Sequence, residues 1–436
     1  MAVTSVGFET ATMSGWWKTV YLDLEKSVPS SAICKGMMPF KESSKVGKEV
    51  RFPVQLRRSQ GFTWKGASGS VGTVYTLNSP ESPVFDEATA TAIECTLQED
   101  IAFGAISRGS PQENAAAYGN LMDVVIGENM KEGLDFMQET MLLYGGGATT
   151  RWAKGIGVVE SETDIDGSGT NTITFTADSW AAGMWPQMEG GYVDIYASDL
   201  STLRNATTAV QVTSIALSTR TITVTGLEAE LDAIAATDVV FPRGTNGQWA
   251  SGIADQLSNA GTLFGISAST YTMWAPNSYA FGSDKLAYAK IMKGLTTGVY
   301  KGLDEDVTIL VNPDGWTDMA NDAAALRRWT DSQKAKVEKG TNKLVFYGVT
   351  MGEVSIVPHP LMMAGSAFAI VPSTWHRFGS TDTTFRLPNA GDKAEEAFFV
   401  SLESSSGVRF RGYWDLAPLC KRPAINTLFT GIVNNT

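Results

Sequence analysis

The chain has 436 residues, 43% hydrophobic and 18% charged, which is the composition of a globular protein long enough for two or three packed units. Its formal net charge of −12 excludes a protein whose whole surface binds nucleic acid or an anionic membrane, although local basic patches stay open. The three cysteines, Cys34, Cys95 and Cys420, form neither a disulfide framework nor a metal-binding spacing, which indicates a reducing compartment.

Residues 1–40 are predicted to form an arm, which packs either on another molecule or on its own domain. They mix polar residues with aromatic ones (Trp16, Trp17, Tyr21) and show no regular period. They also lack the basic region and apolar core of a secretion signal, and no apolar run approaches the roughly 20 residues of a membrane span. We therefore expect a protein made and used in the cytosol, at least at first.

Two strand-like runs with a glycine-rich segment between them predict an extended hairpin. The outgoing run alternates apolar and polar residues, and its apolar positions are Val50, Phe52, Val54 and Leu56. Pro53 lies within this run, so the strand should lie at an edge or stand off the sheet. The return run, "ATATAIECTLQEDIAF", places Ile93, Cys95 and Leu97 on one face. The segment between the runs, rich in Gly, Ser and Thr, predicts a mobile tip.

The segment Ser110–Tyr144 carries the clearest helix signal in the chain. Ser110 is a good N-cap, Pro111 suits the first helical position, and Glu113 completes a capping box. One apolar stripe follows at intervals of three and four residues: Tyr118, Leu121, Met122, Val125, Leu134, Met137, Met141 and Tyr144. Glycines 145–147 should end the helix. A helix of about 50 Å, at about 1.5 Å per residue, usually serves as a spine for other elements.

The composition changes after Lys154, because no further lysine occurs before Lys285 and Thr, Gly and Ala dominate. Short strands are predicted between 158 and 245, including a hairpin in "VQVTSIALSTRTITVT" with its turn near Ser218 and Thr219. This pattern indicates a β-rich module inserted into a larger fold.

Helices and strands alternate from residue 246 onward. Helices are predicted near 284–298 and after Asp314, and strands at "VTILVNP", "KLVFYGVTM", "VSIVPHP" and "AFAIVP". The closing segment "EEAFFVSLESSSGVRFRGYWDLAPLC" predicts two more strands.

The sequence contains no convincing catalytic or metal-binding motif. Its only histidines, His359 and His376, do not belong to a ligand cluster, and the G-x-S-x-G motif of serine hydrolases is absent. The stretch "DIDGSG" begins like a calcium loop, but its twelfth position is Phe175 where a glutamate is required, so a hairpin turn is the favoured interpretation. Glycines 145–147 follow a helix and lack the spacing of a phosphate loop. We therefore expect no enzyme activity, no cofactor and no metal.

Charge is segregated along the first third of the chain. Seven Lys or Arg residues lie between 41 and 65 against two acids, and eleven Asp or Glu residues lie between 81 and 135 against two bases. The two arms of one hairpin could pair these charges with each other. Alternatively, the basic arm lies on the acidic helix of another copy, where charge pairs fix orientation more than affinity. The second interpretation is preferred.

The order of these elements resembles that of the major capsid proteins of tailed bacteriophages, which have the HK97-like fold. Local stretches are similar too: "LLYGGGATTRWAKGIG", "VTSIALSTRTITVTG" and "GVTMGEVSIVPHPLMMAGSAFAIVPSTW". The resemblance covers nearly the whole chain and implies an α+β fold with an N-terminal arm, an extended loop (E-loop), a spine helix, and peripheral and axial domains. It implies the following boundaries: arm 1–40, E-loop 41–106, peripheral domain with spine helix 107–157, β-rich insertion 158–245, axial domain 246–400, and return to the periphery 401–436.

The resemblance implies a structural protein that self-assembles into hexamers and pentamers of an icosahedral shell around double-stranded DNA. Its partners would be copies of itself, weakly held DNA, and separate scaffolding, portal and cement proteins, with no membrane. The chain would be assembled in the host cytoplasm and reside in the virion. Family features that we cannot place here are a cleavable N-terminal scaffold of about a hundred residues and covalent crosslinks between subunits, so we expect a noncovalent shell.

Two groups of residues are expected at subunit contacts. The E-loop group, whose apolar members should be buried only in the assembly, is Lys45, Lys48, Arg51, Phe52, Val54, Arg57, Arg58, Phe62 and Trp64. The group on the spine helix and loop return is Glu94, Glu99, Glu113, Asp123, Glu128 and Glu132. The alternatives are an encapsulin-like compartment shell with an enzyme cargo, disfavoured by the chain length and the insertion, and a β-rich hydrolase or carbohydrate-binding protein.

Overall fold

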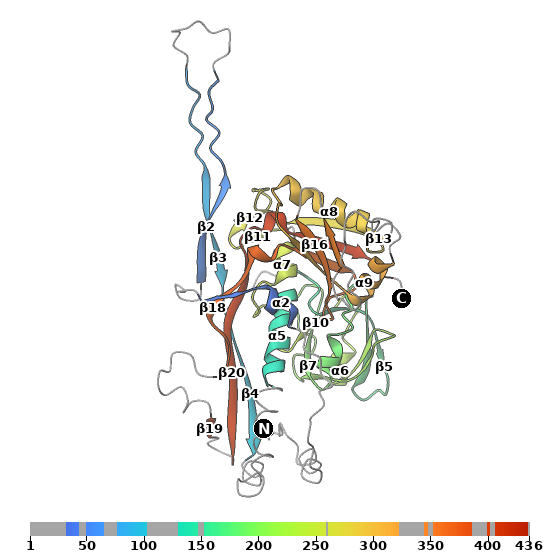
Figure 1. Ribbon diagram of the computed structural model, residues 1–436. Coiled ribbons are helices and arrows are strands. Elements are labelled where there is room, and N and C mark those ends of the chain that lie inside the picture. Colours follow the sequence, from blue (N-terminus) through green and yellow to red (C-terminus); the bar gives the residue numbers. More distant parts are fainter. Residues whose placement is uncertain are drawn as a thin grey trace, which may run out of the picture.

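Two mixed β-sheets, a closed barrel and a projecting hairpin form most of the described part of the protein (Figure 1). The computed structural model describes residues 32–42, 49–64, 76–102, 130–146, 152–258, 260–321, 344–347, 352–385, 399–401 and 406–434. None of the helices in these ranges combines the length and the apolar character that crossing a bilayer requires.

The first sheet is built around β20 (Gly407–Cys420), the longest strand described. β4 (Ile93–Ala102) pairs antiparallel along one edge of β20, while β18 (Trp375–Thr384) and β19 (Phe399–Ser401) share the other edge. β1 (Phe40–Glu42) adds to β18 in parallel and completes this five-stranded sheet.

The hairpin consists of β2 (Glu49–Arg57) and β3 (Val84–Thr91), paired antiparallel. Its expected return run, residues 88–103, proves to be two strands, because the ladder with β2 ends at Thr91 and β4 begins at Ile93. The intervening Ala92 is buried. Beyond it, Ile93, Cys95 and Leu97 pack against the main core instead of continuing the hairpin.

The second sheet has six strands in the order β13-β21-β17-β14-β16-β15. Their bounds are β13 (Asn277–Asp284), β14 (Val307–Val311), β15 (Leu344–Tyr347), β16 (Glu353–Pro358), β17 (Ser366–Ile370) and β21 (Thr427–Ile432). The apolar side chains of α8 (Tyr288–Tyr300) and Met319 of α9 (Pro313–Ala320) share one core with this sheet. The final segment of the chain therefore divides between two sheets, since β20 lies in the first and β21 in the second.

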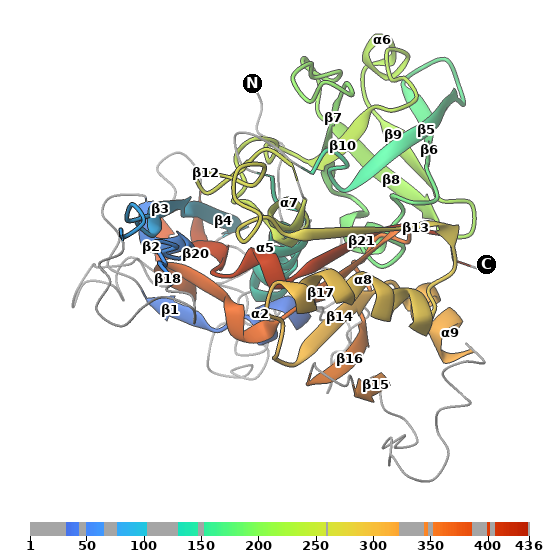
Figure 2. The same cartoon turned by 90° about the horizontal axis from the view of Figure 1, so that it is seen from above.

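The β-rich segment expected between 158 and 245 forms a closed barrel in the order β10-β5-β6-β9-β8-β7. Its strands are β5 (Gly157–Asp164), β6 (Thr170–Phe175), β7 (Tyr192–Tyr196), β8 (Val210–Ala216), β9 (Thr221–Thr225) and β10 (Val239–Pro242). The short helices η2 (Trp185–Met188) and α6 (Glu228–Leu231) accompany them. The β8–β9 pair is the hairpin predicted from the sequence. Seen from above, the barrel stands to one side of the two sheets (Figure 2).

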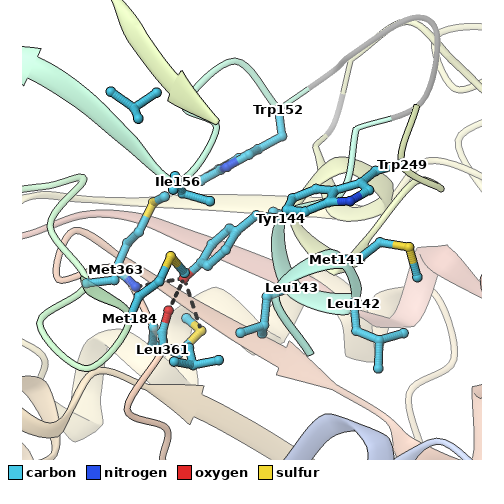
Figure 3. Close-up of a cluster of buried hydrophobic side chains, with 14 of the residues drawn as sticks. Met141, Leu142, Leu143, Tyr144, Trp152, Ile156, Met184, Trp249, Leu361 and Met363 are labelled. Carbon is cyan, nitrogen blue, oxygen red and sulfur yellow. Dashed lines mark hydrogen bonds between the residues drawn. The ribbon is translucent and has the colours of Figure 1, made fainter. Parts of the chain in front are cut away.

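Helix α5 (Lys131–Tyr144) joins these parts. It ends at Tyr144 as predicted, with Gly145 as its C-cap, while residues 110–129 of the predicted helix lie outside the described ranges. The Tyr144 hydroxyl donates to the Leu361 carbonyl at 3.0 Å and accepts from the Met363 N–H at 2.7 Å (Figure 3). Trp152 stacks on the same ring, so the end of α5 is fixed in the main core.

Short elements fill the remaining positions. They are α2 (Ile33–Met37), α7 (Ile253–Leu257), β11 (Thr262–Leu263), β12 (Ile266–Ser267), η3 (Pro372–Thr374) and η5 (Pro423–Ile425).

Candidate functional site

The root of the hairpin packs on its own subunit. Phe52 and Val54 are half-buried against a small apolar cluster, and the Phe52 ring lies 6.3 Å from the Trp274 ring. The Thr89 N–H also donates to the Phe264 carbonyl at 2.9 Å. Phe52 and Val54 were expected to be buried only in an assembly. That expectation is wrong, because both side chains already have partners in the subunit.

The outer part of the hairpin carries large apolar side chains in solvent. Four of them are more than half exposed: Phe62 (67%), Trp64 (88%), Leu77 (71%) and Phe85 (63%). The two arms remain linked here, because the Asn78 side-chain amide donates to the Phe62 carbonyl at 2.9 Å and the Asn78 N–H donates to Thr63 Oγ1 at 2.8 Å. The hairpin therefore presents an apolar surface, well away from the sheets (Figure 1).

The basic residues of the hairpin fall into two kinds. Arg51 pairs with Glu49 at 2.8 Å and with Glu87 across the strands at 3.3 Å, so its charge is balanced inside the hairpin. Arg57 and Arg58 are exposed and make no ion pair with the described residues. Lys45 and Lys48 lie outside the described ranges.

Three of the six expected acidic residues, Glu94, Glu99 and Glu132, lie in the described part of the chain. Glu94 is exposed on β4, and Glu99 is half-buried farther along the same strand. Burial, together with the adjacent Asp100 charge, raises the pKa of Glu99. Glu132 lies in the first turn of α5. Glu113, Asp123 and Glu128 lie outside the described ranges, so a contact between the basic arm and the spine helix stays a prediction.

A buried polar junction, not predicted from the sequence, surrounds Glu139 of α5. Its carboxylate accepts hydrogen bonds from the N–H groups of Cys34 and Lys35, the latter at 3.0 Å. His359 Nε2 lies 2.8 Å from Glu139 Oε1, and Cys34, Glu139 and His359 are all fully buried. No pattern around Glu139 marks it, because its partners lie more than a hundred residues away.

The hydrogen bonds of His359 argue against a metal at this junction. The three side chains are close enough to share an ion. However, His359 Nδ1 accepts the Leu361 N–H at 3.1 Å, so in the neutral ring Nε2 carries the proton and donates to Glu139. A histidine nitrogen that carries a proton has no lone pair for a metal. The residues fit a hydrogen-bonded carboxylate and not a zinc site.

The "DIDGSG" stretch forms the β5–β6 turn that the sequence predicted. Asp164 Oδ1 accepts the N–H groups of Asp166 and Gly167 at 3.0 and 2.8 Å. Glu228 of α6 brings a third carboxylate close to Asp164 and Asp166. Exposed carboxylates commonly gather without an ion, so this geometry by itself assigns no metal.

One cleft of about 660 Å³ opens beside β14 and β16. It is lined by Glu305, Asp306, Thr308, Glu353, Ser355, Pro372 and Ser373. Glu305 is bonded to Ser373 and to Arg422, the latter at 3.2 Å. Two of the three carboxylates in this lining already accept hydrogen bonds from the chain, since Glu305 accepts from the Ser373 hydroxyl and Asp306 accepts from the Glu353 N–H.

Known proteins resemble this chain in structure but not in sequence. No family model and no curated protein matches the chain at the level of sequence. The capsid asymmetric unit of cyanophage A-1(L) contains a chain with 10% sequence identity and a TM-score of 0.54, and the match covers 95% of this chain and 96% of that one. The capsid of cyanophage P-SCSP1u has 9% identity, coverage of 99% and 97%, and a TM-score of 0.44. The capsid of Myoviridae phage XM1 has 7% identity, coverage of 95% and 96%, and a TM-score of 0.45.

The first of these matches is close enough to define the fold. It covers nearly all of both chains, so the likeness is one of the whole chain. The chain therefore has the HK97-like fold of phage capsid proteins, and its mixed sheets with few helices make it an α+β protein, as the order of elements predicted.

Proposed function

We propose that this chain is the major capsid protein of a tailed phage and assembles as hexamers and pentamers of an icosahedral shell around double-stranded DNA. The observation that carries the proposal is the hairpin: in a chain with a capsid fold, a two-stranded arm stands off the body and carries exposed aromatic side chains on its outer part. Large exposed apolar side chains gathered on one element commonly mark a protein–protein contact.

The apolar outer part of the hairpin supplies the affinity in this proposal. Phe62 and Trp64 join no apolar cluster within the described parts of the chain, in contrast to Phe52 and Val54. Covering them on a neighbouring copy removes apolar surface from water at about 25 cal/mol per Å². Obligate interfaces commonly exceed about 2,000 Å², so two rings form the centre of such a contact and not the whole of it.

The unpaired arginines supply orientation. Arg57 and Arg58 lie at the outer end of β2, next to the apolar surface, and their charges are not balanced by the described residues of their own chain. An exposed ion pair contributes only about 0–1 kcal/mol, so their role is to select the correct register on an acidic neighbour. Glu94, Glu99, Glu132 and the acidic residues at 113, 123 and 128 are the proposed recipients.

The parts of the fold take roles accordingly. The five-stranded sheet with α5 corresponds to the peripheral domain, most of the six-stranded sheet to the axial domain, and the barrel to the insertion. Copies of the chain are the principal partners. Scaffolding, portal and cement proteins and weakly held DNA complete the set, with assembly in the host cytoplasm and final residence in the virion.

The test is assembly of the purified chain, followed by light scattering and negative-stain microscopy in low and raised salt. Closed shells several hundred ångströms across are expected. The double variant Arg57→Gln/Arg58→Gln should reduce shell yield, whereas Arg51→Gln, a matched control whose charge is balanced inside the hairpin, should reduce it little. A protein that stays monomeric up to high concentration, both alone and when co-expressed with a scaffolding protein, would contradict the proposal.

A further inference from the structure

We propose that residues 32–42, here called the strap, form a latch that docks between the buried charges of Glu139 and Arg377 and opens as a unit without global unfolding. Glu139 and Arg377 are then positioning residues for the hairpin, which begins seven residues after the strap, at Glu49. The consequence for assembly rests on the proposed function, whereas the latch itself is a property of the single subunit.

Glu139 holds the first end of the strap. Helix α2 has only five residues, and the N–H groups of its first turn have no partner within the helix. Its N-cap residue, Ala32, offers no side chain to satisfy them. The Glu139 carboxylate accepts two of these groups, from Cys34 and Lys35. A negative charge at this end also matches the helix dipole.

Arg377 holds the other end. Its guanidinium donates from Nε to the carbonyl of Met38, the C-cap residue of α2, at 2.9 Å. Its backbone N–H donates to the Pro39 carbonyl at 3.1 Å, and the guanidinium lies 5.8 Å from the centre of the Phe40 ring. Arg377 is 5% exposed, so it is a buried cation at the end of α2 where the dipole favours one.

The same residues connect the strap to both sheets. Arg377 belongs to β18 of the five-stranded sheet. Glu139 bonds His359, in the connection between β16 and β17 of the six-stranded sheet. Lys35 adds an ion pair with Asp135 of α5 at 2.6 Å and a hydrogen bond to Thr383 of β18 at 3.0 Å. A docked strap therefore links α5, both sheets and the start of the hairpin.

The strap has fewer fully buried apolar side chains than the core on which it packs. Cys34 and Met38 are fully buried, whereas Ile33, Met37 and Phe40 are only partly buried against the main core. β1 contributes a ladder of three residue pairs at the edge of the sheet. Segments with few fully buried apolar side chains open at lower free energy than the core. Its anchors are polar and come from distant parts of the chain, so removing one anchor should release the strap and leave the core folded.

Reactivity of Cys34 reports on the latch directly. Burial, with the neighbouring Glu139 carboxylate, raises the pKa of the Cys34 thiol, so it reacts with a thiol reagent only after the strap opens. Cys420 of β20 is equally buried in the main core, and burial raises the pKa of its thiol to about 12. In a Cys95→Ser background, Cys34 reports strap opening and Cys420 reports global unfolding in the same molecule.

The experiment measures labelling rates of the two thiols by mass spectrometry on the unassembled subunit. We expect Cys34 to react at least about tenfold faster than Cys420. Glu139→Gln and Arg377→Met should each accelerate Cys34 labelling by about tenfold or more and leave Cys420 unchanged, because each removes one anchor. Asp255→Asn is the matched control, since Asp255 is also a buried carboxylate that accepts a backbone N–H, but from Trp152, which lies more than a hundred residues from the strap in sequence.

A variant that stabilises the docked strap should change the rate of Cys34 labelling in the opposite direction. Gly36 lies inside α2, and a Cβ at this position would meet nothing within 4 Å. Gly36→Ala should therefore favour the docked helix and slow Cys34 labelling about fivefold, which a variant that merely disturbs folding cannot do. Equal rates for Cys34 and Cys420 in the wild type and in all variants would overturn the latch. Because the assay uses unassembled subunits, this result is independent of whether shells form.

Discussion

Removing the exposed ring of Trp64 from the hairpin should separate subunit stability from assembly. Trp64 is 88% exposed, so Trp64→Ala deletes almost no contact within the subunit. The free energy of unfolding should change by less than about 0.5 kcal/mol, as is usual for surface substitutions. The same substitution should strongly weaken any interface that covers the ring.

The magnitude follows from the area at stake. A tryptophan buries about 150–250 Å² when it is fully covered, which at about 25 cal/mol per Å² corresponds to about 4–6 kcal/mol. Truncation of aromatic anchors in interfaces typically costs about 2–4 kcal/mol, because neighbouring groups adjust. At about 1.4 kcal/mol per factor of ten, one contact should weaken by about 30- to 700-fold.

The assay compares the melting temperature of the unassembled subunit with the protein concentration at which shells first scatter light. Trp64→Ala should leave the melting temperature nearly constant and raise the threshold concentration for shell assembly by at least about tenfold. Tyr300→Ala is the matched control, because Tyr300 is an 83% exposed aromatic residue at the end of α8, far from the hairpin in sequence. An unchanged assembly threshold for Trp64→Ala, or an equal shift for both variants, would refute the role given to the hairpin.

Three further substitutions test the fold that supports the hairpin. Trp274→Ala should remove the support under Phe52 at a cost of about 3–5 kcal/mol, seen as protease cleavage of the hairpin while the melting of the main core is preserved. Gly379→Ala should destabilise the five-stranded sheet by at least about 3 kcal/mol, seen as a loss of soluble protein, because a Cβ there would lie 1.9 Å from the Asp415 carbonyl oxygen. Burial and two nearby lysines lower the pKa of His376 to about 4, so the unfolded chain binds this proton first, near pH 6.5. The free energy of unfolding should therefore fall by about 1 kcal/mol as the pH drops from 6.5 to 4, a value reduced to allow for the partial exposure of the ring. His376→Gln should abolish that part of the fall, as measured by denaturant titrations at each pH.

Local patterns predicted the elements that depend on near neighbours. The β8–β9 hairpin, the Asp164 turn and the end of α5 at Tyr144 all follow from residues within a few positions of one another. The division of residues 84–102 into β3 and β4 could not be predicted in this way. The sequence pattern of a strand runs through both, and they differ only in the strand with which each one pairs. The partner of β4 is β20, more than three hundred residues further along the chain.

The polar junction illustrates the same limit for the site. Gln138, Glu139 and Thr140 lie outside the predicted apolar stripe of α5, with Glu139 opposite to it, and all three are nevertheless buried. A helical pattern assigns such residues to solvent. Glu139 itself contacts the strap through Lys35 and the β16–β17 connection through His359, and neither segment leaves a signal near residue 139.

The distribution of charge changes what the net charge of −12 implies. Residues 158–245 contain twelve Asp or Glu against three Arg and no Lys, so this segment alone carries −9. Two of those arginines form ion pairs within the barrel segment, Arg204 with Asp238 and Arg220 with Glu160. The remaining residues carry 31 Lys or Arg against 34 Asp or Glu, which is nearly balanced. The acidic charge therefore argues against nucleic-acid contact by the barrel, but it does not argue against such contact by the two sheets. Any surface that lies against enclosed DNA should be sought outside residues 158–245.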